Sequence, residues 1–435
     1  MRRVLVALLL ASVAAAPAAP AGAQRDTATT SYLVSGVRVI HRRTNASIVV
    51  ANLYLLGGVR QATPRTAGLE NLLLQATEYG TQRYPKTVLR RAMARTGSEI
   101  AIQPREDWTL VSVRTTTSEL DSTWAIFAER LMHPRLDSAD VELVRDQLLS
   151  GVRQRADSPD ATLDYLADSV AFAGHSYALS PVGTESSIAR LTLAELRAYA
   201  REQLVTSRML LVVVGNVPRE KVETLVRTTI GRLSAGGYTW TMPDTLAALR
   251  ADAMIAPRAL PTNYIQGYAI GPGANSADAP ALRVAAAVLS GRLFTEIRSR
   301  RNLTYAVSAS FRDRGLTSFG LYVTTTLPDT TLALMRAELR AMQSVELDTK
   351  LLQPLVQQFI TEYFLDNETI TAQADFLARA QLYRGDFRAG ERFVAELRAV
   401  TGADVQRVAR RYLRNVRWAY VGDPSRVSRE RLLAF

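Results

Sequence analysis

The chain has 435 residues, 47% of them hydrophobic and 22% charged, with no cysteine and a formal net charge of +12. This length exceeds the size at which one hydrophobic core keeps growing, so we expect at least two domains, and the missing cysteine excludes disulfides and cysteine redox chemistry. The basic charge is almost all arginine interspersed with acids, as in RDQLLSGVRQRAD at 145–157, without a nucleic-acid motif. We therefore favour a solvated, arginine-rich surface and expect no nucleic-acid partner.

The first residues have the layout of a secretory signal peptide. Arg2 and Arg3 precede an apolar run from Val4 to Ala16, and the small residues Ala21, Gly22 and Ala23 follow. This pattern predicts a signal peptide over 1–23, cleaved after Ala23. No later stretch approaches the roughly 20 apolar residues needed to span a bilayer. We expect an exported protein without a membrane span, which is periplasmic where the host has two membranes.

Hydrophobic periodicity, together with Gly and Pro breaks, predicts the elements that follow. They are strands from residue 31 and from residue 46, a helix from 66–70 to a turn at 79–81, a helix over 86–96 closed by Gly97, strands from 99 and from 108, helices over 119–132 and 138–155, an irregular stretch around 174–183, a helix over 192–203 and a strand over 209–214.

One segment occurs twice. The run LTLAELRAYAREQLVTSRMLLVVVGNVPREKV from Leu191 is similar to VTGADVQRVARRYLRNVRWAYVGDPSRV from Val400. Both predict an arginine-rich amphipathic helix, a short joint, an apolar strand, a turn and a following helix. The repeat predicts an α+β protein with two tandem homologous domains, each a mostly antiparallel sheet packed with helices. We place the N-terminal domain at 31–240, a linker at 241–257 and the C-terminal domain at 258–435.

The stretch from Gly57 to Thr81, GGVRQATPRTAGLENLLLQATEYGT, has the outline of a metallopeptidase helix without its ligands. A strand, a polar loop and an apolar helix are the context in which an inverted zinc motif, His-x-x-Glu-His, would sit. The matching positions hold Asn71, Leu74 and Gln75. The chain's three histidines, His41, His133 and His175, are too far apart to give helical ligand spacing, so we expect packing or surface roles for them and no metal on this chain.

With these segments, and with SPVGTESSIARLTLAEL from Ser180, SGRLFTEIRSRRNLTYAVSAS from Ser290 and YVGDP from Tyr420, the sequence resembles the insulinase and pitrilysin family of zinc metallopeptidases. The similarity is to the type with two alike domains per chain, such as mitochondrial processing peptidase. It implies that the zinc histidines fall on Asn71 and Gln75 and the general base on Leu74. The third ligand would fall near Gly151 or Val152, where Asp146 and Asp157 are out of register. The family's metal-hydroxide mechanism is then unavailable to this chain.

The resemblance also implies a role for the second half. Arg298 and Tyr305 match an arginine and a tyrosine that, in this family, approach the active site from the other domain or from a partner subunit. They would help to bind substrate and the tetrahedral intermediate. We expect the helix to stop between them, because Asn302 stands where the family has glycine and asparagine tolerates a left-handed cap.

These observations lead to the interpretation that the chain is the non-catalytic subunit of an exported heterodimeric zinc peptidase acting on peptides. A homologous, zinc-bearing partner would supply the metal, and this chain's C-terminal domain would complete its site. The strand at Glu99–Gln103 is the counterpart of a peptide-binding edge, although Ile100 and Ala101 replace the family's polar residues there.

Three alternatives stay open at this point. The chain could be a stand-alone scaffold or peptide-binding protein of the same fold, a hydrolase with an unrelated set of residues, or a protein that binds nucleic acid or membrane surfaces. The second lacks support from a Gly-x-Ser-x-Gly elbow or a Ser-x-x-Lys motif.

Overall fold

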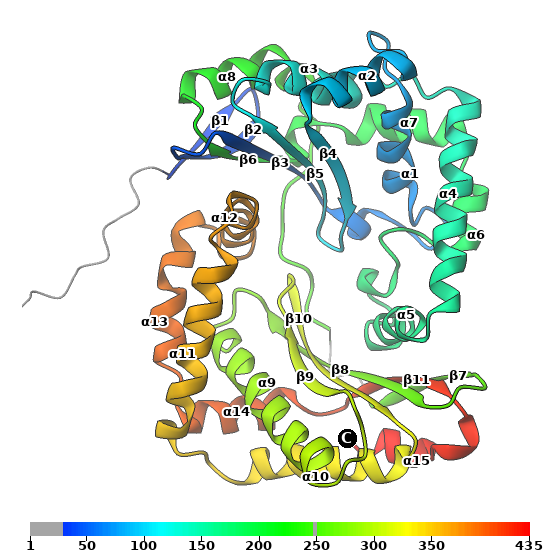
Figure 1. The fold of residues 1–435 in the computed structure, drawn as a ribbon, viewed down its shortest axis with the longest axis vertical. Helices are drawn as coiled ribbons and strands as arrows, with labels where there is room; N and C mark the ends of the chain where they lie inside the picture. Colours follow the sequence, from blue (N-terminus) through cyan, green and yellow to red (C-terminus); the bar gives the residue numbers. More distant parts are fainter. Residues whose placement is uncertain (1–28, 247–249) are drawn as a thin grey trace, which may run out of the picture.

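The computed structural model describes residues 29–246 and 250–435. The signal peptide predicted over 1–23 lies outside these residues. Figure 1 shows two domains of sheet and helices, one above the other, with the earlier part of the chain in the upper domain. Within the described ranges, no helix combines the length and the apolar composition that crossing a membrane requires.

The first domain is built on a six-stranded sheet in the order β1-β2-β6-β3-β5-β4. Strands β2 and β6 run parallel, and every other neighbouring pair is antiparallel. The central strands β3 and β6 are buried along nearly their whole length, which requires cover on both faces of the sheet. The strands are β1 (Thr29–Val34), β2 (Val37–Arg43), β3 (Ile48–Leu56), β4 (Glu99–Pro104), β5 (Trp108–Thr116) and β6 (Met209–Gly215).

The predicted helices of this half are present, and the structure adds two that we did not predict, α5 and α6. Helix α2 ends at a left-handed Gly97, as the sequence indicates. We missed α5 because Pro159 reads as the end of the preceding helix. Instead, Ser158 caps a new helix in which Pro159 takes the first position. The helices are α1 (Leu69–Ala76), α2 (Lys86–Thr96), α3 (Leu120–Met132), α4 (Ser138–Asp157), α5 (Pro159–Ala171), α6 (Glu185–Arg190), α7 (Leu193–Gln203) and α8 (Arg219–Thr228).

The second domain has a five-stranded sheet in the order β7-β11-β8-β10-β9. Strands β7 and β11 run parallel, and the other neighbouring pairs are antiparallel. Its strands are β7 (Asp252–Pro257), β8 (Asn263–Gly273), β9 (Val307–Arg312), β10 (Leu316–Thr325) and β11 (Arg417–Gly422). Its helices are α9 (Ala279–Leu293), α10 (Pro328–Ser344), α11 (Thr349–Asp366), α12 (Ile370–Arg384), α13 (Phe393–Arg398), α14 (Gly402–Tyr412) and α15 (Arg429–Leu433).

The two sheets have the same topology once β1 is set aside. The order β2-β6-β3-β5-β4 corresponds to β7-β11-β8-β10-β9, with the parallel pair at the same end. The repeated segments form α7 with β6 and α14 with β11. Each of these helices begins with a capping box, from Thr192 and Glu195 in α7 and from Thr401 and Asp404 in α14. The predicted α+β fold with two homologous domains is therefore confirmed.

In each domain, one face of the sheet is covered by a helix from the other domain. One face of the first sheet packs on Ala374, Leu377 and Ala378 of α12, which belongs to the second half. One face of the second sheet packs on Leu163 and Ala167 of α5, from the first half. In Figure 1, α12 lies below the upper sheet and α5 lies above the lower sheet. This exchange explains how both faces of the central strands are covered.

The segment predicted as a linker at 241–257 is partly ordered sheet. Residues Asp252–Pro257 form β7, which pairs with β11, so the interpretation of these residues as linker was wrong. Just before this segment, the Trp240 indole donates to the Leu382 carbonyl of α12 at 2.8 Å. The domains also meet at Asp107, between β4 and β5, which accepts from the Gly315 amide between β9 and β10 at 2.9 Å and from the Tyr383 hydroxyl of α12 at 2.8 Å.

Candidate functional site

The chain enters α1, the helix that matches the zinc motif, through a tight contact. Gly68 has a φ of 86°, and a Cβ there would lie 2.9 Å from the backbone of Val182 and Gly183. The Ser187 hydroxyl donates to the Ala67 carbonyl at 2.8 Å from the same side. Only glycine fits this approach, so the loop before α6 fixes where α1 begins.

The three degenerate positions on α1 lie in the protein interior. Leu74 is 1% exposed and packs in the main core of the first domain. Asn71 is 2% exposed, and its Oδ1 has no hydrogen-bond partner among the described residues. Gln75 is half-buried. A hydrocarbon side chain at the position of the general base cannot accept a proton, and neutral amides are poor zinc ligands.

The position of the third ligand is equally unsuited to a metal. Gly151 and Val152 lie on α4, which packs against α1; Gly151 is exposed and Val152 is half-buried. Across the described ranges, no group of three or more His, Cys, Asp or Glu side chains has the arrangement to hold a metal ion. The residues at the family's zinc positions therefore do not fit zinc.

The histidines lie in three separate elements. His41 is buried in β2, and burial lowers its pKa. His175 precedes a short 3₁₀ helix, where its Nδ1 accepts from the Tyr177 amide at 3.1 Å, and burial lowers its pKa too. His133 follows the end of α3. The structure brings none of them to α1.

A buried ion pair that sequence reasoning missed holds α1 in place. Arg208 donates to Glu70, the residue before Asn71, at 2.8 Å, and to the Leu56 carbonyl at 2.7 Å. The Tyr199 hydroxyl donates to the same Glu70 oxygen at 2.8 Å. Burial lowers the pKa of Arg208, but the charges of Glu70 and Tyr199 and the hydrogen bonds to them together raise it by more. This network joins α1 to α7 and to the first sheet, so α1 is fixed by structural contacts.

The second predicted pair does come together. Arg298 lies in a π-helical turn, η6 (Phe294–Ser299), that continues α9, and Tyr305 lies just before β9. The Arg298 guanidinium carbon is 4.6 Å from the centre of the Tyr305 ring and 5.0 Å from that of Phe294. Tyr305 is 82% exposed. A guanidinium over a ring face at this distance forms a cation–π contact.

The helical turn ends at Ser299, and Asn302 follows it with the left-handed conformation that the sequence predicts, at a φ of 52°. Its amide donates to the Arg298 carbonyl at 3.1 Å, and this turn brings Tyr305 back over Arg298. The nearby carboxylate of Glu296 is taken by Arg300 at 3.1 Å and Arg301 at 2.8 Å. Within the described part of the chain Arg298 has no carboxylate partner, so its donors are available to a ligand.

The predicted site residues lie in different domains. Asn71, Leu74 and Gln75 belong to α1 of the upper domain, and Arg298 and Tyr305 follow α9 in the lower domain (Figure 1). Strand β4, the counterpart of the peptide-binding edge, is an edge strand that pairs with β5 alone. Ile100 in it is buried, and Glu99 pairs with Arg114 at 2.6 Å.

Comparison with known families decides the identity of this fold. The profile of the insulinase family, peptidase family M16, matches residues 38–185, and the profile described as "Peptidase M16 inactive domain" matches residues 190–359. The chain belongs to the insulinase family. The resemblance seen in the sequence is thus confirmed over most of the chain.

Relatives of this family member carry several descriptions. An uncharacterized zinc protease of Mycobacterium bovis is 25% identical over 91% of this chain and 93% of its own length. Subunit 1 of the mitochondrial cytochrome b-c1 complex of Caenorhabditis elegans is 22% identical over 90% of this chain and 86% of its own. The alpha subunit of the mitochondrial processing peptidase of Bos taurus is 22% identical over 52% of this chain and 42% of its own.

Solved structures share the fold. The peptidase M16 inactive domain from Pseudomonas fluorescens superposes with a TM-score of 0.82, at 17% identity, over 91% of this chain and 98% of that one. A protease from Helicobacter pylori gives a TM-score of 0.81, at 16% identity, over 91% and 99%. At these identities the likeness establishes the architecture alone.

Proposed function

We propose that the chain is the non-catalytic subunit of an exported heterodimeric zinc peptidase, and that its second domain completes the active site of a homologous, zinc-bearing partner. Arg298 would donate to a peptide carbonyl, and the Tyr305 hydroxyl would donate to the developing oxyanion. The signal-like residues 1–23 support export, to the periplasm where the host has two membranes.

The observation that carries the proposal is the contrast between the two halves. The zinc positions are filled by a buried leucine and by amides, whereas Arg298 and Tyr305 lie together at the surface without a carboxylate partner among the described residues. A ring that is 82% exposed adds little to stability, so a purely structural role does not explain why it holds a half-buried arginine. A partner with the opposite pattern, zinc ligands without this pair, would complement the chain.

The test uses a quenched, unstructured peptide substrate. Cleavage is measured with this chain alone, with a zinc-motif homologue from the same organism alone, and with the two mixed, each with and without a chelator. We expect activity only in the mixture, removed by the chelator. Cleavage by this chain alone would show that it carries a site of its own and would contradict the proposal.

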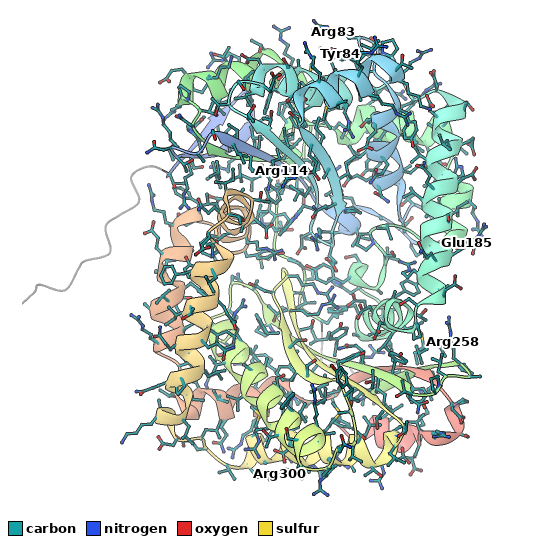
Figure 2. All side chains as sticks on the ribbon, viewed as in Figure 1. Arg83, Tyr84, Arg114, Glu185, Arg258 and Arg300 are labelled. Carbon is teal, nitrogen blue, oxygen red and sulfur yellow. The ribbon has the colours of Figure 1, made fainter. Side chains whose placement is uncertain are left out.

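Variants of this chain test whether Arg298 and Tyr305 contribute to peptide cleavage by the mixture. Tyr305→Phe should lower the kcat of the mixture by roughly 100- to 1,000-fold, the usual loss for one oxyanion donor. Arg298→Ala should lower kcat/KM as well. The matched control is Arg300→Ala, because Arg300 lies two residues from Arg298, is exposed and pairs with Glu296 (Figure 2). Equal activity of the mixtures that contain Tyr305→Phe, Arg298→Ala and Arg300→Ala would show that Arg298 and Tyr305 do not contribute to catalysis.

A second candidate is a scaffold without peptidase activity. The relative described as a subunit of the cytochrome b-c1 complex favours it, because that description is of a subunit of a complex and not of a protease. This candidate predicts that no zinc-motif homologue gains activity on mixing, and that the chain purifies in a stable complex whose other members lack the zinc motif.

A further inference from the structure

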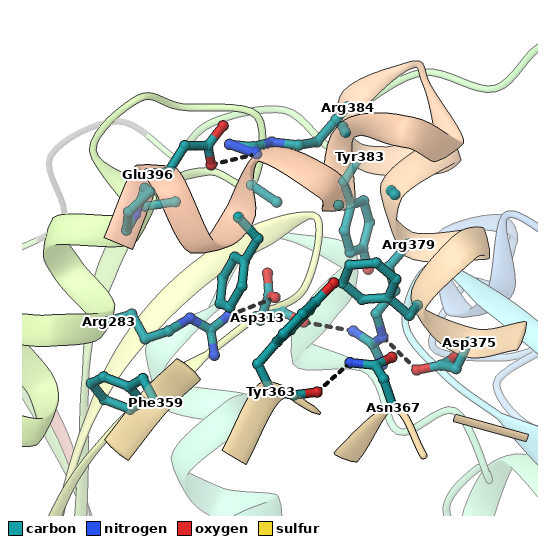
Figure 3. Close-up of a pocket in the computed structure, with 18 of the residues that line it drawn as sticks. Arg283, Asp313, Phe359, Tyr363, Asn367, Asp375, Arg379, Tyr383, Arg384 and Glu396 are labelled. Atoms are coloured by element: carbon teal, nitrogen blue, oxygen red, sulfur yellow. Dashed lines mark hydrogen bonds and ion pairs between the residues drawn. The ribbon is translucent and has the colours of Figure 1, made fainter. Parts of the chain in front are cut away.

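The second domain contains a cavity of about 380 Å³ that shares no residue with the Arg298–Tyr305 pair. It lies where the start of α9 and the end of β9 meet α11, α12 and α13 (Figure 3). Small residues leave the room for it, with Ala274, Ala279, Ala372, Ala380, Ala389 and Gly390 in its wall. Its volume is in the range of sites that hold small ligands or single side chains.

Aromatic rings form much of the wall. Tyr363 is the centre of a cluster in which its ring lies 5.3 Å from that of Phe376 and 5.1 Å from that of Phe393. Phe311 and Phe359 line the remaining sides. These spacings are those of favourable ring pairs, so a further ring entering the cavity would meet edges and faces at similar distances.

The charged groups in the wall are already paired. Arg283 donates to Asp313 at 2.8 Å, Arg379 to Asp375 at 2.6 Å and Arg384 to Glu396 at 2.7 Å. The wall also contains Glu362, so four carboxylates face three guanidinium groups. An anion would therefore meet a net negative wall in which each arginine already has a carboxylate partner.

A cationic ligand is disfavoured for a different reason. The Arg283 guanidinium carbon lies 5.1 Å from the ring centre of Phe311 and 5.4 Å from that of Phe393. Arg283 thus occupies the ring faces that would bind a second cation and would repel it. Both signs of ligand charge meet an obstacle, whereas a neutral ring meets none.

We propose that this cavity binds a neutral aromatic side chain of a peptide, that of phenylalanine, tyrosine or tryptophan. The inference goes beyond the proposed function, because it needs neither the partner nor zinc. It gives the chain a peptide preference of its own, set by α11, α12 and α13.

The probe is N-acetyl-4-fluorophenylalanine amide, whose binding to the whole chain is followed by fluorine NMR. A ligand of this size in a preformed pocket should bind with a Kd of roughly 1 mM. N-acetyl-phenylalanine with its free carboxylate and N-acetyl-lysine amide should compete at least tenfold more weakly than unlabelled N-acetyl-phenylalanine amide. Equal competition by either charged compound would contradict the ligand class.

Two variants test the location. Ala372→Phe places a ring in the cavity and should weaken probe binding at least tenfold. Thr371→Phe adds the same ring at the neighbouring, exposed position of α12, outside the cavity wall, and should leave binding unchanged. Ala279→Phe fills the cavity from α9 and covers the case in which Ala372→Phe fails to fold. Unchanged binding in a folded, filled variant, or no binding by the unaltered chain, would overturn the proposal.

Discussion

Helix α1 and the turn after α9 occupy corresponding places in the repeat. Along the chain, α1 lies between β3 and β4, and the turn lies between the matching strands β8 and β9. The two regions nevertheless differ in burial and in pairing. Around α1, Leu74 is in the core and Glu70 is held by the buried Arg208. After α9, Tyr305 is 82% exposed, and Arg298 lies over the rings of Phe294 and Tyr305 without an ion pair among the described residues. Buried, satisfied groups support a fold, whereas exposed and unpaired ones are free to bind. The region that matches the zinc motif is therefore core in this chain, and the region of Arg298 and Tyr305 is surface.

The largest effect should come from Glu70→Ala. The substitution leaves the 1% exposed Arg208 guanidinium without its carboxylate, and breaking a buried pair in this way costs about 3–5 kcal/mol. Denaturant unfolding gives the free energy of unfolding. Glu223→Ala, which removes a carboxylate from the more exposed pair with Arg219, should cost less than about 1 kcal/mol. Similar losses in the two variants would show that α1 is not held as described.

Leu74→Ala should destabilise the chain by about 2–5 kcal/mol, because it opens a cavity in a closed core. The exposed Leu351 on α11 is the matched control, and Leu351→Ala should stay within about 0.5 kcal/mol. If Leu74→Ala were as mild as its control, the position of the family's general base would be accessible rather than core.

Much of the contrast could be read from the sequence. The zinc positions, the left-handed Asn302 and the repeated α7–β6 segment follow from local patterns of ligands, caps and apolar runs. The sequence predicts the end of the helix but not the contact of Arg298 with Tyr305, because residues seven apart share a face only in a continuous helix.

Contacts between distant segments could not be read in this way. Glu70 and Arg208 are 138 residues apart, and Asp107 and Tyr383 are 276 apart. No local periodicity connects such positions. Helix α5 was missed because a proline ends one helix and begins the next equally well. The cavity wall was missed because its aromatic residues come from four separate elements.

The two domains are joined by an ion pair between Glu106 and Arg314 that acid should weaken. Burial raises the pKa of Glu106, but Arg314, 2.6 Å away, together with Arg312 and a backbone hydrogen bond lowers it by more, so the pKa lies below the ordinary 4.5. A lowered pKa contributes stability above pH 4.5, and this contribution is lost as the pH falls through the lowered value. Glu106→Gln should cost about 1–3 kcal/mol near pH 7, and less as the pH falls below 4.5. A pH-independent difference would contradict the pairing.

The smallest effect should be that of Arg298→Ala and of Tyr305→Ala on stability. Arg298 has no ion pair in the described part of the chain, and Tyr305 is mostly exposed, so each free energy of unfolding should change by less than about 0.5 kcal/mol. The double variant should change by less than the sum of the two single changes, because each single variant already removes the shared cation–π contact. Thermal and denaturant unfolding of the isolated chain measure this. A loss of 2 kcal/mol or more would place the pair among the structural contacts, as with Glu70 and Arg208, and the contrast between the two regions would disappear.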